Sequence, residues 1–451
     1  MRRLYLKLTL IVFQIGYLTL SVPGYTHSDN ISGFEGKNIR SIQIKGLSHT
    51  KPWIVYRELL TKQGNLYQDA TFQFDIKALE KLDIFADVSP EITEKEGQLE
   101  IILLVKELPP FIPHPTAEVT EENGLSFGGG ILGTNLWGRN HYIEGTYKTG
   151  LHQKAVKRLS LEYSIPRILH KRVEMRLWLA DERRKNVLEE FREDPYQVAR
   201  LQLFPTLMYT ESFRLKAGFE SCMEWFQADR DSITLSPQNR DFLPSVGVSV
   251  IFDSRDYAGN PTKGFFGELG IFNFGGLLGG PSDFLQTIAD FRIYQPLTGR
   301  QHILLSQLLT LQSGSLNNTL PRYRRFWLGG ANSVRGFELD EQRGANQALF
   351  TLEYRFLLMK PRVIPLFLFD WYLDLGLQPI VAVDAGTTWD NFSDKKQWLG
   401  SIITGAQILV PYIQMIRLEW GIVPYWHDDR LSISFHFSAI DKPTAQRFRR
   451  R

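Results

Sequence analysis

The sequence predicts a mainly β chain: a 16-stranded antiparallel transmembrane β-barrel preceded by one small α+β domain. Three observations predict it. Segments of about ten residues alternate apolar and polar side chains over most of the chain. Charged side chains recur on the face that a soluble sandwich would have to bury. A unit of 70 residues with helical and strand patterns comes first, and a proline-rich stretch separates it from the rest.

The first 28 residues have the order of a secretory signal peptide. Basic residues are followed by an apolar run from Leu8 to Leu20 and then by small, turn-forming residues. The alternative is a retained anchor helix. The apolar run is shorter than the roughly 20 residues that a spanning helix needs, so we expect residues 1–28 to be removed on export.

Residues 38–107 form the predicted small domain. A strand pattern comes first, two segments with helical spacing follow (52–62 and 71–85), and two strands joined by a charged turn close the unit. This order predicts helices packed on a small sheet. Residues 108–115 contain four prolines between Pro109 and Pro115. Because proline fixes φ and lacks a backbone donor, we expect a stiff linker there.

Residues 116–438 carry the strand alternation. A soluble β-sandwich also alternates with period two, but it would have to bury charged side chains, each at several kcal/mol if unpaired. These are Glu162, Glu174, Arg176, Glu220, Glu224, Arg417 and Glu419. A barrel with an apolar face in lipid and a polar, wet lumen accommodates all of them. About sixteen strands fit the pattern, which is even, as bacterial barrels generally are. Residues 439–451 remain as a basic C-terminal tail.

Composition excludes several classes of function. The net charge of +3, from 52 basic and 49 acidic side chains, is too balanced to indicate nucleic-acid binding. One cysteine, Cys222, cannot form an internal disulfide. No nucleophile elbow, zinc-protease motif or phosphate-binding loop is present, and the nine histidines are scattered. We therefore expect no enzymatic activity, no cofactor and no metal.

Five ordered motifs resemble the Omp85 superfamily of outer-membrane proteins. The segment 57–92 is similar to the helix pair of a POTRA domain, so the small domain resembles a single POTRA. FDSRDYAGNPTKGFFGEL (252–269) is similar to the family's periplasmic hairpin, and RRFWLGGANSVRGF (324–337) to its sixth extracellular loop. ALFTLEYRF and VAVDAGTTW are similar to the strands after that loop. The resemblance covers about 400 residues of the 451.

The loop motif Val334, Arg335, Gly336 and Phe337 is the candidate site. Alternation turns Glu353 inward in the first strand after the loop and Asp384 inward in the next. If the loop folds back into the barrel, Arg335 can meet one or both carboxylates, and a guanidinium forms strong bidentate bonds to a carboxylate. Gly386 would leave room for the loop. The alternative is an exposed loop whose arginine contacts solvent.

The resemblance implies an insertase that assists folding of outer-membrane β-barrels, with the POTRA domain in the periplasm binding the client. Client strands would pair at a seam between the first and last strands. The seam residues would be Ala117, Val119, Ile433, Phe435 and Phe437.

Implied partners are unfolded outer-membrane clients or a secreted protein, membrane lipid and lipopolysaccharide, and accessory periplasmic proteins. A two-partner secretion pore and a passive diffusion channel are the alternative functions. A single POTRA and residues beyond Phe437 depart from the family's usual pattern.

Overall fold

The computed structural model describes residues 33–441 except 81, 83, 121–123, 151–156, 169–170, 186–192, 210–212, 229–232, 257–259, 298–301, 316–319, 331, 339, 367–370, 411–413 and 424–431. The expected signal peptide and the tail from residue 442 lie outside the described residues. The chain divides into two compact units. One comprises the residues up to Thr116 with Gly129–Thr146 and Ser160–Leu177, and the other comprises the remainder. The prediction of a mainly β chain is confirmed.

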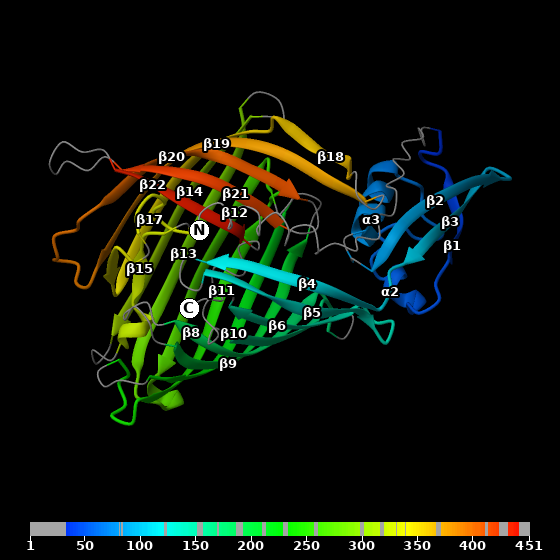
Figure 1. Cartoon of the computed structure of the whole chain (residues 1–451). Coiled ribbons are helices and arrows are strands. Elements are labelled where there is room, and N and C mark those ends of the chain that lie inside the picture. The colour runs from blue at the N-terminus through cyan, green and yellow to red at the C-terminus, as the bar shows by residue number, and fades with distance from the viewer. Residues whose placement is uncertain are drawn as a thin grey trace. The chain divides into compact units, whose positions relative to one another are not determined.

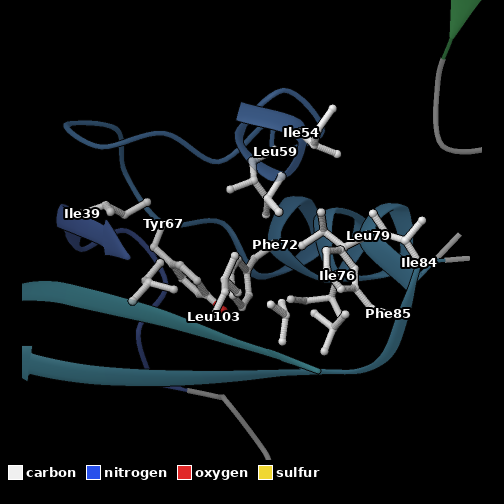
Figure 2. Close-up of a cluster of buried hydrophobic side chains, with 14 of the residues drawn as sticks. Ile39, Ile54, Leu59, Tyr67, Phe72, Ile76, Leu79, Ile84, Phe85 and Leu103 are labelled. Carbon is white, nitrogen blue, oxygen red and sulfur yellow. The ribbon is translucent and has the colours of Figure 1, made fainter. Parts of the chain in front are cut away.

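The small α+β domain contains a three-stranded sheet and two helices. Its elements are β1 (Asn38–Lys45), α2 (Pro52–Tyr56), α3 (Asp69–Glu80), β2 (Phe85–Lys95) and β3 (Gln98–Glu107). The strand order is β1-β3-β2, with β1 parallel and β2 antiparallel to β3. Figure 2 shows the helices and the sheet enclosing one apolar core, in which Tyr67 and Phe72 lie at the centre. This α+β arrangement agrees with the prediction.

Two carboxylates fix the loops of this domain. Asp75 is fully buried and accepts the backbone N–H groups of Leu60 and Thr61, each at 2.8 Å. These bonds take the chain out of helical geometry, so α2 ends at Tyr56 instead of continuing to residue 62 as predicted. Leu60 is consequently 49% exposed and lies outside the core.

Glu107 anchors the loop between β1 and α2. Its carboxylate accepts the N–H groups of His49 at 2.9 Å and Thr50 at 2.7 Å, and also the hydroxyl of Ser48. Burial acts to raise the pKa of Glu107, but the hydrogen bonds from Ser48, Thr50 and His49 outweigh it and lower the pKa to about 2.

The large sheet is antiparallel wherever its register is defined (Figure 1). Its first strands are β4 (Phe111–Thr120), β5 (Gly124–Leu136), β6 (His141–Gly150), β7 (Lys157–Ile165), β8 (Val173–Lys185), β9 (Glu193–Tyr209) and β10 (Arg214–Gln227). The next are β11 (Arg240–Asp253), β12 (Gly264–Gly275), β13 (Asp283–Pro296) and β14 (His302–Ser315), with a 3-10 turn η1 (Gly276–Leu278) between β12 and β13. The last are β17 (Asn346–Phe356), β18 (Met359–Leu366), β19 (Trp371–Trp389), β20 (Leu399–Val410), β21 (Gln414–Val423) and β22 (Ser432–Asp441).

Consecutive strands are neighbours from β4 to β14, and β17 follows β14. The segments β17 and β18 both pair with β19: Arg355 lies opposite Ile380, and Met359 lies opposite Leu377. The strands β17 and β18 therefore lie one after the other along the same edge of β19. At the end of the sheet, β22 pairs with β21 and, through Ala439 opposite Val119, with β4.

Two predicted boundaries were wrong. Residues Phe111 to Pro115 lie in β4 and not in the linker, because proline is tolerated in a strand where its missing N–H is not needed for pairing. Residues Ala439 to Asp441 lie in β22 and not in the tail. None of the helices among the described residues is long and apolar enough to cross a membrane.

The large sheet has an apolar outer face and a charged inner face. Exposed side chains along its strands include Phe219, Met223, Trp225, Val246, Val248, Val250, Leu269, Ile271, Leu308, Phe350, Leu352, Val381, Val383 and Ile402. Of the charged residues assigned inward from the sequence, Glu224, Arg417 and Glu419 are buried. A soluble protein buries the first kind and exposes the second, so this distribution is that of a sheet that faces lipid.

Candidate functional site

The candidate site lies in the long connection between β14 and β17. This connection contains a short 3-10 turn η2 (Arg322–Arg324) and two short paired strands, β15 (Phe326–Leu328) and β16 (Gln342–Gly344). We call residues 320–345 the strap. Gly329, Gly330 and Gly336 have positive φ values of 108°, 82° and 97°, which only glycine adopts without strain. They allow the chain to turn sharply between β15 and β16.

Arg335 lies within the strap and is 5% exposed. Its Nε donates to Asp384 at 2.7 Å and its Nη2 donates to the other oxygen of Asp384 at 2.9 Å, which makes a bidentate pair. Its Nη1 donates to Glu353 and to Glu419, each at 3.0 Å. The backbone N–H of Arg335 also donates to Asp384 at 3.2 Å. One guanidinium thus contacts three buried carboxylates.

The three carboxylates come from three strands. Glu353 lies on β17, Asp384 on β19 and Glu419 on β21. Alternation places each of them inward: Leu352 and Val383 next to them are exposed on the opposite face. In the register of β17 and β19, Thr351 lies directly opposite Asp384, and its hydroxyl donates to that carboxylate at 3.0 Å. The strand register therefore fixes the position of the arginine's main partner.

Neighbouring side chains occupy the remaining carboxylate oxygens. Arg355 Nε donates to Glu353 at 2.6 Å, and Gln407 Nε2 donates to Glu419 at 3.3 Å. On the strap itself, Asn332 accepts from Arg417 at 2.9 Å. A buried ion pair is stable only when further hydrogen bonds satisfy its lone pairs and protons, and this network supplies them. The arrangement can hold a loop in place.

Apolar contacts surround the ionic cluster. Val334 and Phe337 flank the arginine and pack with Phe326 and Leu328 of β15 in one buried cluster. Its other members come from the inner face of the sheet: Ile288, Leu309, Leu311, Leu349, Leu399 and Val423. The strap therefore has a hydrophobic core of its own against the sheet.

Two strand glycines make space for the strap. A Cβ on Gly386 would lie 2.8 Å from Val334 Cγ2, and a Cβ on Gly421 would lie 2.2 Å from the Cα of Gly336. As expected, the missing side chain of Gly386 leaves space that the strap residue Val334 occupies. The contact at Gly421 was not anticipated from the sequence.

The structure brings Arg335 together with Glu353 and Asp384, the partners assigned from alternation. It adds Glu419, which strand alternation also places on the inner face but does not place beside Arg335. Of the seam residues, Ala117 and Val119 lie on β4, and Ile433, Phe435 and Phe437 lie on β22 opposite Ile422, Trp420 and Leu418 of β21. The side chains of these five lie outside the described residues.

Comparisons with known proteins agree with this architecture. Residues 37–108 match the POTRA domain, described as a surface antigen variable number repeat. The chain is 24% identical over 399 residues to the outer membrane protein assembly factor BamA of Nitratidesulfovibrio vulgaris, covering 79% of this chain and 44% of that protein. This chain therefore spans less than half the length of that relative.

Solved structures show the same fold. BamA from Haemophilus ducreyi lacking POTRA domains 1–3 is similar with a TM-score of 0.63 at 16% identity, covering 88% of this chain and 83% of that one. CdiB from Escherichia coli has a TM-score of 0.62 at 15% identity, covering 89% and 75%. Residues 135–439 match the Omp85 superfamily domain, which is more than half of the chain. The resemblance seen in the motifs is confirmed: the chain belongs to the Omp85 superfamily and carries a POTRA domain.

Proposed function

We propose that the protein is a non-enzymatic outer-membrane assembly factor, which helps other β-barrel proteins to fold and insert. The observation that carries the proposal is the junction between β22 and β4. β22 is the last strand of the sheet and β4 the first, and Ala439 lies opposite Val119 where they meet. Parting of these two strands exposes two strand edges.

The exposed edges supply the mechanism. A strand edge presents unpaired N–H and C=O groups, and an unfolded client strand can satisfy them by β-augmentation. We infer that the client pairs with β4 or β22 through main-chain hydrogen bonds, which makes recognition tolerant of client sequence. Alternating lipid-facing side chains of the client would then continue the apolar outer face.

The same proposal makes the large sheet a closed barrel of sixteen strand positions, since β17 and β18 share one position beside β19. Its outer face would contact membrane lipid and lipopolysaccharide, with the POTRA domain in the periplasm. In the POTRA sheet β2 is an edge strand, and its free edge offers a second place for a client strand. Accessory periplasmic proteins would bind there as well.

In this mechanism Arg335 is a positioning residue and not a catalytic one. By joining β17, β19 and β21 it would hold the last strands of the sheet rigid. Opening would then be confined to the junction of β22 with β4. The motif residues Val334, Gly336 and Phe337 would keep the arginine aimed at its partners.

A protein-secretion pore is the second candidate. The fold likeness to CdiB is as close as the likeness to BamA, with TM-scores of 0.62 and 0.63. The same strap and junction would then serve a secreted protein that crosses the lumen. A passive diffusion channel is the third candidate.

Depletion of the protein followed by quantitative profiling of the outer membrane separates the three. An assembly factor predicts loss of many barrel proteins, a secretion pore predicts loss of one exported protein, and a channel predicts altered solute uptake alone. As a direct test, the purified protein in liposomes should accelerate the appearance of heat-modifiable, folded barrel from a urea-unfolded client. Liposomes without the protein are the control, and equal rates in both would contradict the proposal.

A further inference from the structure

The strap makes a second set of contacts with the sheet, at η2. The hydroxyl of Tyr323 donates to Asp241 at 3.0 Å, and its ring stacks on Phe226 with centroids 4.1 Å apart. Arg324 Nη1 donates to Glu224 at 3.2 Å, and its guanidinium lies 4.7 Å from the centroid of the Phe274 ring. Two consecutive strap residues are thus each held by one polar and one aromatic contact.

The residues of β10 and β11 that contact Tyr323 and Arg324 are buried and held in place. Asp241 on β11 and Glu224 on β10 are each 2% exposed. Asp241 also accepts the N–H groups of Leu235 and Ser236, which fixes its orientation. Phe226 lies directly opposite Asp241 in the register of β10 and β11, so ring and carboxylate are presented together. The contact site of Tyr323, which we call its seat, is therefore fixed by the sheet and by the loop residues Leu235 and Ser236.

An apolar cluster lies beneath Tyr323. It is formed by Trp178, Ala180, Tyr196, Val198, Cys222, Phe226, Ala228 and Ile233, and Tyr323 packs against it. Cys222 is the one cysteine of the chain, and it is 2% exposed. Tyr323 closes part of this cluster, so its removal would admit water to side chains that are now covered.

This seat is separate from the Arg335 cluster. In the strand order β10 and β11 are followed by β12, β13 and β14 before β17, and Arg335 contacts β17, β19 and β21. The two sets share no carboxylate. The strap therefore crosses from one part of the sheet to another and is held at η2 and again at Arg335.

We propose that Tyr323 and Arg324 form a latch that releases on its own, while Arg335 remains bound and serves as the hinge. Within the described part of the chain, each latch residue has one polar bond to the sheet, whereas the Arg335 guanidinium has four bonds to three carboxylates. The latch is the weaker attachment. Its release swings η2 away from β10 and β11 and uncovers Cys222, while β15 stays in its apolar cluster with Val334 and Phe337.

Cys222 supplies a direct test in the full-length protein reconstituted in liposomes. The rate of its modification by a water-soluble maleimide is measured in four proteins: wild type, Tyr323→Phe with Arg324→Gln, Arg322→Gln and Arg335→Gln. Arg322 belongs to the same 3-10 turn and is exposed, so its variant is the matched control. Hydrogen exchange of backbone amides in residues 322–325 and 333–337 is followed in parallel.

The latch variant should label about tenfold faster than wild type, because two bonds to charged groups are lost. Its exchange should rise in 322–325 and stay within about twofold of wild type in 333–337. Arg322→Gln should match wild type in both measurements. Arg335→Gln should raise exchange in 333–337 without a comparable change in labelling.

Labelling of the latch variant at the Arg322→Gln rate would overturn the proposal. A parallel rise in both segments would also overturn it, because the strap would then move as one unit. Exchange in β17 checks that the sheet remains folded; if it rises, the single variants Tyr323→Phe and Arg324→Gln are used instead, each with about a threefold effect expected. The readout does not involve client assembly, so failure of the latch and failure of the proposed function are distinguishable.

Discussion

Gly421 and Gly336 meet backbone to backbone: a Cβ placed on Gly421 would lie 2.2 Å from the Cα of Gly336. No side chain can yield there, since the obstacle is main chain. Replacement of Gly421 by alanine should therefore push the strap away from β21 and destabilise the fold by about 1–3 kcal/mol, as overpacking does. Hydrogen exchange in residues 333–337 should increase.

Gly400→Ala is the matched control for this prediction. Gly400 lies on the neighbouring strand β20, and a Cβ there would meet its nearest atom only at 4.0 Å. The two variants are compared by the midpoint temperature at which the compact, heat-modifiable form is lost. Equal midpoints would mean that the close approach at Gly421 is unimportant.

Arg335→Ala should be among the most damaging single substitutions in the strap. It leaves three buried carboxylates without their shared cation, and breaking a buried ion pair typically destabilises a protein by about 3–5 kcal/mol. Both the assembly activity and the order of the strap should decrease in this variant. Arg335→Lys keeps the charge but cannot form the bidentate pair with Asp384.

We expect the lysine variant to be intermediate in both thermal stability and assembly. If it equalled wild type, charge alone would explain the site, and the planar geometry of the guanidinium would be irrelevant. If the alanine variant kept wild-type activity and loop order, the positioning role proposed for Arg335 would be wrong.

The junction of β22 with β4 can be closed covalently. Val119 lies opposite Ala439, and cysteines at such a cross-strand pair are within reach of a disulfide. Oxidised Val119→Cys with Ala439→Cys should lose assembly activity, and a reducing agent should restore it. The control pair is Ala289→Cys with Thr310→Cys, which lie opposite each other on β13 and β14.

The control pair should remain active in both redox states. Buried Cys222 is common to all these proteins and does not distinguish them. Full activity of the oxidised junction variant would show that assembly does not require the two strands to part.

Glu107 gives the POTRA domain a defined acid sensitivity. Its pKa is lowered from the ordinary value of 4.5 to about 2, so the folded state favours the charged form. The resulting stability is fully present above pH 4.5 and is lost as the pH falls toward 2. Urea unfolding followed by helical circular dichroism should show a decline of the midpoint over this range, and Glu107→Gln should weaken that decline.

Glu96→Gln is a suitable control, because the Glu96 side chain is 85% exposed. It should retain the wild-type dependence on pH. A Glu107→Gln protein with an unchanged pH profile would mean that the hydrogen bonds to Ser48, His49 and Thr50 do not govern the acid response.

Part of the Arg335 cluster could be predicted from the sequence. Period-two alternation places Glu353 and Asp384 inward, and the two lie on neighbouring strands, so their proximity could be inferred. Glu419 was missed because β20 separates β21 from β19. Alternation assigns the face of a residue, but it does not say how far the strap extends across non-adjacent strands.

The same limit explains the latch and the wrong boundaries. Tyr323 and Asp241 are 82 positions apart in the sequence, and no periodicity connects a loop residue with a distant strand. Prolines at 113 and 115 suggested a linker, yet proline is also compatible with a strand where its N–H is not required. The end of α2 depends on Asp75, a tertiary contact that helical spacing cannot reveal.

The Arg335 cluster also reports on strand register. A slip of one residue along β17, β19 or β21 would turn Glu353, Asp384 or Glu419 to the outer face, because successive side chains point in opposite directions. Arg335 would then lose a partner, and a carboxylate would face lipid. The complete cluster can form only when all three strands are aligned correctly, so full docking of the strap selects the sheet with the correct register.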